Sequence, residues 1–459
     1  MIKKRINPYL LIILSFISII LIGTILLVMP FASSTGESFG FVDSLFMATS
    51  AVCVTGLSVM PNGLGADMTL YGKIVMMLLI EVGGLSIITI AVFFLTIIRA
   101  KIGITNKFVL REALNQENVK GLVYLVRKIV IISFSVQIIC TLINWYPFYT
   151  YLQAHGINDV WRSLFISLFH SASAFNNAGF DIILGNKGLV ELSSTSGVLP
   201  TFSMVTINIT TMFMIVIGGI GFIVIDDIIR HKRWKKLKLH TKITIITTVL
   251  LIALGTLVIK LTSDLGFMES MFTAITSRTA GFQTWDMSVM AESYPAVYVM
   301  VISLMFVGAS PCSTGGGIKT TTFAIIIIAI FSYATGRKAK AFNRKIPFSQ
   351  IFKAFVLMNV GIIMIVISTL LIMVVQPELP ISKVIFEVVS AFSTTGLSLG
   401  ITSSLNIGSK LILSFLMLFG RLGPLTVIGV VNKNWMNQKK EDIDYVEESV
   451  IIGWKKLLL

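Results

Sequence analysis

The chain has 459 residues, of which 55% are apolar and only 13% are charged. A soluble domain carries about 25% charged residues, so the composition excludes an ordinary soluble protein and predicts an all-α protein that crosses a membrane several times. The net charge is +15, from 37 Lys and Arg against 22 Asp and Glu.

Apolar stretches of about 20 residues, long enough to span a bilayer as helices, recur along the chain. They cover 9–30, 74–98, 122–145, 199–225, 243–262, 351–375 and 411–431, and an eighth, 295–334, is interrupted in its middle. Basic residues precede the first stretch, as they do in a signal peptide. The stretch is long and no small-residue cleavage site stands out, so we expect a retained first helix.

The charges divide between the two sides that these spans define. With the N-terminus inside, the inner segments hold 28 Lys and Arg against 9 Asp and Glu, and the outer segments hold 7 against 12. The positive-inside rule therefore predicts a multi-pass protein of the cell membrane with both termini in the cytoplasm. The same rule explains the basic run 230–242 better than nucleic-acid binding does, and leaves lipid contact or protein docking as secondary roles.

Four short apolar segments, each between two predicted spanning helices on the outer side, end in a glycine turn. The segments are 44–59, 167–182, 269–284 and 384–399, with Gly56, Gly179, Gly281 and Gly396 at equivalent positions. We expect four helix–pore-loop–helix repeats with pseudo-fourfold symmetry around one central pore. The repeats are 1–100, 118–230, 240–335 and 348–432, and a cytoplasmic tail follows at 433–459.

The segments are too short to cross the membrane, so each is a re-entrant or an interfacial helix. Irregular backbone at membrane depth must be buried or line a watery cavity, and backbone carbonyl groups can replace the hydration shell of a cation. A lone glycine could simply be a helix-packing position, but four aligned turns favour an ion filter. Its candidate residues are Val54, Thr55, Gly56, Asn177, Ala178, Gly179, Thr279, Ala280, Gly281, Thr394, Thr395 and Gly396.

The second spanning stretch of the third repeat is interrupted at 308–320, where Pro311 and three successive glycines cannot form a stable helix interior. A phosphate-binding loop is improbable, because Ile318 separates Gly317 from Lys319. A simple kink is the plainer alternative to a flexible barrier inside the filter, which we favour. The candidate gate residues of the loop are Gly308, Ser310, Cys312, Thr314, Gly315, Gly316, Gly317 and Lys319.

Arg421 lies within the last spanning stretch, where a charge is costly and indicates function. We expect it to obstruct the inner pore together with the loop, and Lys319 to lie nearer the cytoplasm. Glu81 is either a partner of one of these cations or sits near the outer end of its helix. We also expect the repeats to differ: only the third breaks its inner helix, and only the fourth carries an arginine there.

The sequences VTGL, NNAGF, RTAGF and TTGL, each between two spanning helices, resemble the four filter segments of the Ktr/Trk/HKT superfamily of K⁺ transporters. The likeness is strongest to the membrane subunit of bacterial Ktr systems. It implies K⁺ bound at Gly56, Gly179, Gly281 and Gly396, and glycine rather than serine at Gly56 is associated with K⁺ preference. It also implies that 308–320 is an intramembrane gate and that the basic residue at Arg421 faces the permeation path.

The resemblance further implies a homodimer with the tail in its contact. A cytoplasmic ring of nucleotide-binding regulators of the KtrA/KtrC type would dock beneath it, so that ATP or ADP acts only through this partner and no cofactor binds the chain itself.

Two other function classes remain for comparison. An ion-coupled secondary transporter also uses broken helices at mid-membrane, but such folds usually have inverted repeats, and these four share one orientation. Of the four histidines only His170 lies near a turn, where polar packing is a better interpretation than a proton relay. A membrane enzyme is not expected, because the chain has no HExxH and no GxSxG motif.

Overall fold

The computed structural model describes residues 8–97, 122–183, 188–190 and 201–431. The predicted tail, 433–459, lies outside the described residues, as do the ends of the first two predicted repeats. Five described helices are long and apolar enough to cross a membrane, namely α1 (Pro8–Val28), α7 (Leu122–Ala154), α10 (Thr201–Ile220), α12 (Leu239–Thr262) and α17 (Phe348–Val375).

Two hydroxyl side chains of α1 are paired within the helix itself, where a bilayer offers no other partner. In α1 the hydroxyl groups of Ser15 and Thr24 donate to the carbonyl oxygens of Ile12 and Ile20, at 2.6 and 2.7 Å. Bonds of this kind let serine and threonine stand in an apolar helix without an unpaired donor.

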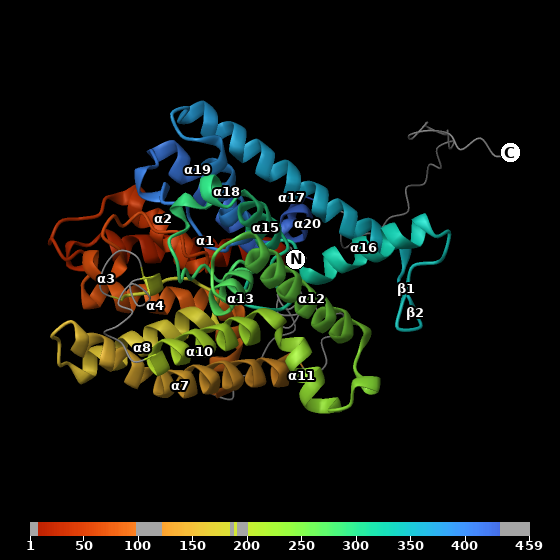
Figure 1. The fold of residues 1–459 in the computed structure, drawn as a ribbon, viewed down its shortest axis with the longest axis horizontal. Helices are drawn as coiled ribbons and strands as arrows, with labels where there is room; N and C mark the ends of the chain where they lie inside the picture. Colours follow the sequence, from red (N-terminus) through yellow and green to blue (C-terminus); the bar gives the residue numbers. More distant parts are fainter. Residues whose placement is uncertain (1–7, 98–121, 184–187, 191–200, 432–459) are drawn as a thin grey trace, which may run out of the picture.

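One series of elements occurs four times along the chain: a long helix, a short helix, a glycine turn and a second long helix that is broken (Figure 1). The short helices are α2 (Phe41–Val52), α8 (Val160–Phe175), α13 (Phe267–Thr276) and α18 (Ile381–Ser393). The broken helices are α4 (Leu70–Leu85) with α5 (Ile87–Ile97), α10 with α11 (Phe222–His231), α15 (Pro295–Phe306) with α16 (Thr320–Ala334), and α19 (Ile407–Leu422) with α20 (Pro424–Val431).

Small elements connect these helices. On the side of the glycine turns lie η1 (Pro30–Ala32), α3 (Leu64–Asp67), η3 (Met287–Val289), α14 (Met290–Ser293) and η4 (Thr402–Ser404). On the opposite side lie η2 (Trp234–Lys236) and an antiparallel hairpin of β1 (Lys340–Ala341) and β2 (Arg344–Lys345), which pairs Lys340 with Lys345.

The expectation that only the third repeat breaks its inner helix is wrong. Single residues with positive φ interrupt the other three, namely Ser86 (68°), Gly221 (96°) and Gly423 (77°). One left-handed residue is enough to end a helix and start another in a new direction. The third repeat differs in the length of its interruption, since thirteen residues separate α15 from α16.

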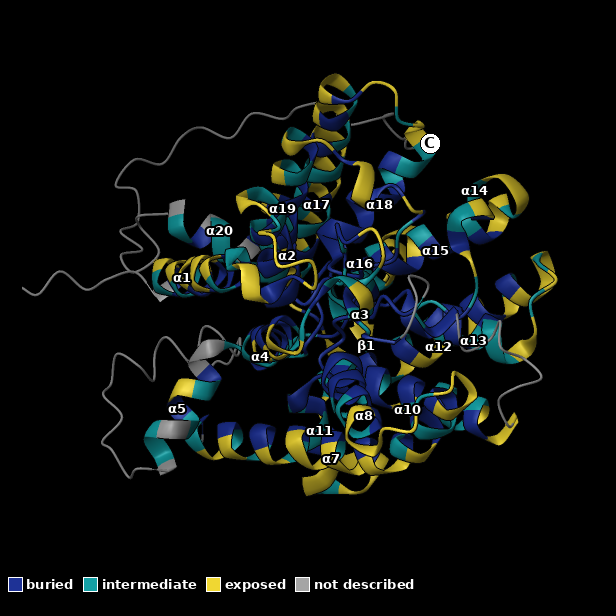
Figure 2. Ribbon diagram, turned by 90° about the vertical axis from the view of Figure 1, so that its left-hand side faces the viewer, coloured by how far each residue is buried: buried dark blue, intermediate teal, exposed yellow. Residues whose placement is uncertain are grey.

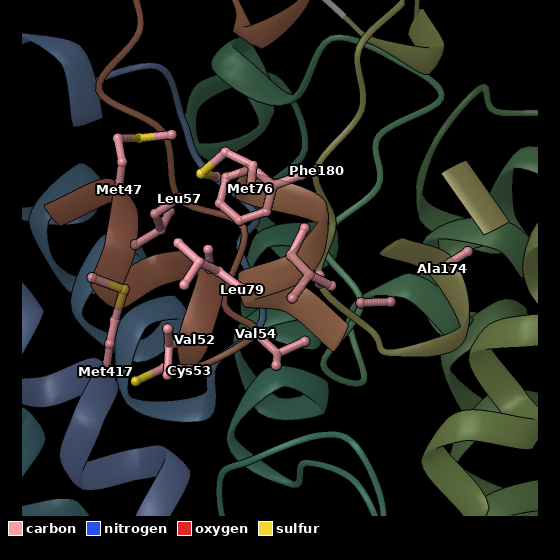
Figure 3. Close-up of a cluster of buried hydrophobic side chains, with 14 of the residues drawn as sticks. Met47, Val52, Cys53, Val54, Leu57, Met76, Leu79, Ala174, Phe180 and Met417 are labelled. Carbon is pink, nitrogen blue, oxygen red and sulfur yellow. The ribbon is translucent and has the colours of Figure 1, made fainter. Parts of the chain in front are cut away.

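The short helices form the buried centre and the long helices surround them (Figure 2). In α2 and the turn after it, Met47, Val52, Cys53 and Val54 are fully buried, and they belong to one apolar cluster with Met76 of α4 (Figure 3). The outer faces of the long helices expose apolar side chains instead, such as Leu142 at 60% and Val374 at 79%. This pattern, buried polar backbone inside and apolar side chains outside, suits a lipid solvent.

Glycines in the broken helices let them approach the ends of the short helices. A Cβ atom on Gly83, Gly218 or Gly420 would collide with the carbonyl oxygen of Val52, Phe175 or Phe392 respectively. Each of these carbonyls belongs to the residue four positions before a turn glycine. Small residues at helix interfaces allow such close contact, and here they bring the second helix of a repeat against its own turn.

Candidate functional site

Four glycine turns meet at the centre of the molecule and close a ring. A Cβ atom on Gly56 would meet the carbonyl oxygen of Ala178, and one on Gly179 would meet that of Ala280. In the same way Gly281 faces Thr395, and Gly396 faces Thr55. Each turn therefore touches the next, and the fourth touches the first. No side chain larger than hydrogen fits at any of the four positions.

Each turn contains two residues with positive φ, separated by one residue. All four glycines have positive φ, between 69° and 97°. Two positions earlier, Val54, Asn177, Thr279 and Thr394 also have positive φ, between 52° and 77°. Non-glycine residues rarely adopt this conformation, least of all β-branched ones. It costs about 1–3 kcal/mol per residue and persists only where surrounding structure enforces it, often at functional sites.

The short helices hold the turns by their amide groups. Ser50 and Ser390 accept hydrogen bonds through Oγ from the amides of Gly56 and Gly396, at 3.2 and 3.0 Å. The amide of Ala178 donates to the carbonyl oxygen of Ser173 at 2.8 Å, and that of Gly281 donates to Thr276 at 3.3 Å. All four glycine turns are thus anchored from outside the ring.

The carbonyl oxygens of the turns are left without protein partners. In the described part of the chain, none of the carbonyl oxygens of 54–56, 177–179, 279–281 and 394–396 accepts a hydrogen bond from the protein. Buried carbonyl groups are nearly always paired. A ring of unpaired, preoriented oxygens has the chemistry that replaces the water of a monovalent cation.

On the side of Ser58, Asp181, Gln283 and Ser398 the ring opens into a cavity of about 400 Å³. These four polar residues stand two positions after the glycines and line the cavity. Gln283 Nε2 donates to the carbonyl oxygen of Ser398 at 3.2 Å and so joins the third turn to the fourth. Burial raises the pKa of Asp181 to about 7, although a hydrogen bond with the backbone of Ile183 opposes the shift.

Glu387 of α18 binds residues that follow the fourth turn. Its Oε1 accepts hydrogen bonds from the hydroxyl groups of Ser398 and Thr402, the latter at 2.8 Å. The carboxyl group is buried, with 1% of the residue exposed. Neither Asp181 nor Glu387 was expected from the sequence, although an acidic residue inside or directly after an apolar turn segment is a usable signal.

The loop 308–320 packs against the ring residues Thr279 and Thr394. Its base is closed by a bridge between Val307 and Ile318. The amide of Gly316 donates to Thr394 Oγ1 at 3.0 Å, and a Cβ atom on Gly315 would collide with Thr279 Oγ1. The loop thus touches two of the residues that carry positive φ in the ring, with no room for side chains between them.

Three further loop residues, Ser310, Cys312 and Thr314, hydrogen-bond the second repeat. The amides of Ser310 and Thr314 donate to the carbonyl oxygens of Gly219 and Gly218, at 3.0 and 3.2 Å. The carbonyl oxygen of Cys312 accepts from the amide of Phe222, at the break between α10 and α11, at 2.9 Å. Ser310 and Thr320 also share a hydrogen bond between their hydroxyl groups at 2.9 Å.

Two cations predicted from the sequence bind carbonyl groups of the loop. Arg421 donates to Thr314 O, and its Nη2 lies 2.5 Å from Gly83 O and 3.0 Å from Gly84 O. Lys319 Nζ donates to Gly315 O at 2.7 Å. Lys319 is thus bonded within its own loop, to a residue four positions earlier in the chain.

Glu81 does not pair with either cation among the described residues. It lies beside the side chains of Asn176 and Gln137 instead. His170 donates or accepts through Nε2 to Thr211 Oγ1 at 2.8 Å and packs edge-on against Phe148 and Phe282. This is the polar packing role that its position in a half-helix suggests.

Comparison with known proteins identifies the family. The family model TrkH, described as a cation transport protein, matches residues 4–440. The chain belongs to the TrkH family. Family members are cation transport proteins, so the described ring lies in a chain of a transporter family rather than an enzyme family.

Relatives of this TrkH-family chain match it over almost its whole length. Ktr system potassium uptake protein B of Bacillus subtilis (strain 168) is 34% identical over 463 residues, which cover 98% of this chain and 97% of that protein. Potassium/sodium uptake protein NtpJ of Enterococcus hirae is 34% identical over 468 residues, covering 98% of each.

A solved structure shares the fold. The potassium transporter TrkH from Vibrio parahaemolyticus aligns with a TM-score of 0.69 and covers 94% of this chain and 86% of that one, at 18% sequence identity. At that identity the likeness concerns the fold alone.

Proposed function

We propose that the protein takes up K⁺ across the cell membrane through the ring of glycine turns, which acts as a selectivity filter at the axis of four pseudo-symmetric repeats. The observation that carries the proposal is the closed ring of carbonyl groups without protein partners. Carbonyl oxygens suit K⁺, whereas a divalent-cation filter needs charged side chains. The name of one relative, Ktr system potassium uptake protein B, supports the same ion.

The loop 308–320 and Arg421 form the gate in this proposal. The loop contacts Thr279 and Thr394 directly below the ring, and Arg421 ties it to α4. A cation that leaves the ring inward meets the loop backbone and two positive charges. Displacement of the loop would therefore be needed for conduction.

The termini lie in the cytoplasm, and the protein works as a homodimer above a ring of nucleotide-binding regulators of the KtrA/KtrC type. The excess of Lys and Arg in the inner segments supports the orientation. The word "system" in the name of the Bacillus subtilis relative supports an assembly of several components.

The test is uptake of K⁺ or ⁸⁶Rb⁺ into cells that lack their own K⁺ uptake, comparing wild type with Gly56→Ser. A serine side chain would collide with Ala178 O in the ring, so we expect weaker preference for K⁺ over Na⁺. Gly156→Ser is the matched control, because Gly156 also has positive φ, 75°, but has nothing within contact distance. Unchanged selectivity in a well-expressed Gly56→Ser protein would refute the filter.

An ion-coupled cation transporter is the second candidate, favoured by the potassium/sodium name of one relative. The two mechanisms separate in voltage-clamp recordings with K⁺ as the permeant ion. Current through a gated filter reverses at the K⁺ equilibrium potential and needs no co-ion. The reversal potential of a coupled carrier shifts with the gradient of Na⁺ or H⁺.

A further inference from the structure

A buried arginine beside the third turn has no acidic partner. Arg278 stands three positions before Gly281, and only 7% of the residue is exposed. Its Nη2 donates to the carbonyl oxygen of Gly308 at 3.3 Å, and its Nε has no hydrogen-bond partner. No ion pair of the described residues includes Arg278.

Three other basic groups that are wholly or mostly enclosed are better satisfied. Arg421 reaches three carbonyl oxygens, and Lys319 has a carbonyl oxygen at 2.7 Å. Lys410, at the outer side, has the carboxylate of Asp43 at 2.6 Å. Burying a charge without a partner of opposite sign is costly. The charge of Arg278 is therefore the least compensated of this set.

A small cavity lies beside Arg278. It has a volume of about 20 Å³ and is lined by Arg278, by Thr248 of α12, by Gly219 of α10 and by aliphatic side chains. Thr248 is also buried, at 6% exposure, and its hydroxyl group has no partner. One cavity is thus lined by two residues from different elements, each of which has an unpaired donor.

We infer that this cavity is a binding site for one small inorganic anion of the halide class, with chloride as the natural occupant. The guanidinium supplies the charge, and the Thr248 hydroxyl can donate a second hydrogen bond. A water molecule also fits a space of this size, but it brings no charge to balance Arg278. Phosphate, carboxylates and lipid headgroups are too large for it.

The site has a defined place in the molecule. Ala309, the second residue of the gate loop, lines the same cavity. Gly308, which accepts the bond from Arg278, is the residue before it. An anion here would hold together α10, α12, the third turn and the beginning of the loop. The site does not depend on which ion the ring conducts.

Bromide replaces chloride in the test, because its anomalous scattering locates it directly. Crystals of the full-length protein grown or soaked in potassium bromide should show one anomalous peak between Arg278 and Thr248. A peak-free cavity, or density that stays the same in bromide and in gluconate and is therefore water, would overturn the inference.

Stability in detergent gives a second readout that excludes binding at crystal concentration only. The thermal midpoint of the wild-type protein should rise with chloride or bromide concentration when gluconate replaces the halide at constant K⁺ and ionic strength. Arg278→Gln and Thr248→Val should lose that dependence. Lys260→Gln, which removes an exposed charge near the outer end of α12, should keep it. A halide dependence that persists in Arg278→Gln counts against the site.

Discussion

The acidic residues of the described chain that line the cavity beside the ring are Asp286 and Asp181, and Asp181 lies two positions after a turn glycine. Of the four residues that follow the glycines by two positions, it alone is acidic. An acidic group in a cavity with low-dielectric walls raises the local concentration of cations. Because burial raises its pKa to about 7, the carboxyl group of Asp181 changes its charge within the physiological pH range.

We therefore expect the apparent affinity for external K⁺ to fall as the external pH drops below about 7. The carboxylate is charged above its pKa and neutral below it, so acidification removes the attraction. Asp181→Asn should weaken uptake at low K⁺ and make it nearly independent of pH in this range. Uptake of ⁸⁶Rb⁺ at several K⁺ concentrations and pH values measures both effects.

Asp264→Asn serves as the control for that measurement, since Asp264 lies outside the cavity lining and hydrogen-bonds Tyr294. It should behave like wild type. If Asp181→Asn keeps the wild-type pH profile, another group is responsible for the titration.

The loop between α15 and α16 is the element on which the proposed barrier depends. Removing Gly315 to Gly317 takes away the segment that touches Thr279 and Thr394. We expect a higher rate of K⁺ uptake and less dependence on a regulatory partner. Flux per molecule of correctly folded protein, reconstituted in vesicles, is the measurement. An equal or lower flux would show that the loop is not the barrier.

Contacts between helix and turn rest on glycine at a few positions. Gly218→Ala places a methyl group against the carbonyl oxygen of Phe175, which is backbone and cannot turn aside. Overpacking of this kind typically costs about 1–3 kcal/mol. We expect a lower thermal midpoint and reduced uptake, since Phe175 ends the short helix that carries the second turn.

The neighbouring Gly219→Ala is the matched control in the same helix. Its methyl group would meet only the side-chain amide of Asn177, at 3.2 Å, and the Cβ atom of Ala309 at 3.9 Å. A side chain can yield where backbone cannot, so the loss of stability should be smaller. Equal losses in both variants would assign the effect to helix α10 in general rather than to the contact with Phe175.

At the scale of the whole molecule, hydropathy and the repeated glycine segments predicted the membrane-spanning helical class and the position of the short helices. Periodicity did not reveal the breaks at Ser86, Gly221 and Gly423, because one positive φ value leaves little trace in composition. The position of Arg421 within an apolar spanning stretch identified it as a functional candidate. The sequence could not identify the carbonyl groups of Gly83, Gly84 and Thr314 as its partners, since backbone acceptors have no sequence signature.

Arg278 is the clearest omission among the charged residues. It stands inside the third glycine segment, and its charge is visible in the sequence. Its lack of an acidic partner and the cavity beside it follow only from the packing of α10 against α12 and α13. Buried charges are therefore detectable from the sequence, whereas their compensation is not.

The proposed homodimer involves the whole protein, and the tail is proposed to contribute to its contact. We expect removal of 440–459 to weaken dimer formation in detergent. Size-exclusion chromatography with light scattering compares the truncated and full-length proteins at several concentrations. A truncated protein that remains dimeric to the same dilution would place the contact elsewhere.

One chain supplies all four turns of the ring, and each turn touches a neighbour of different sequence. A mutation in the gene therefore alters a single quadrant, while in a homotetrameric pore the same mutation alters all four. Selection can therefore adjust the proposed filter one quarter at a time. The unequal turns VTGL, NNAGF, RTAGF and TTGL are the kind of patchwork that such piecemeal adjustment produces.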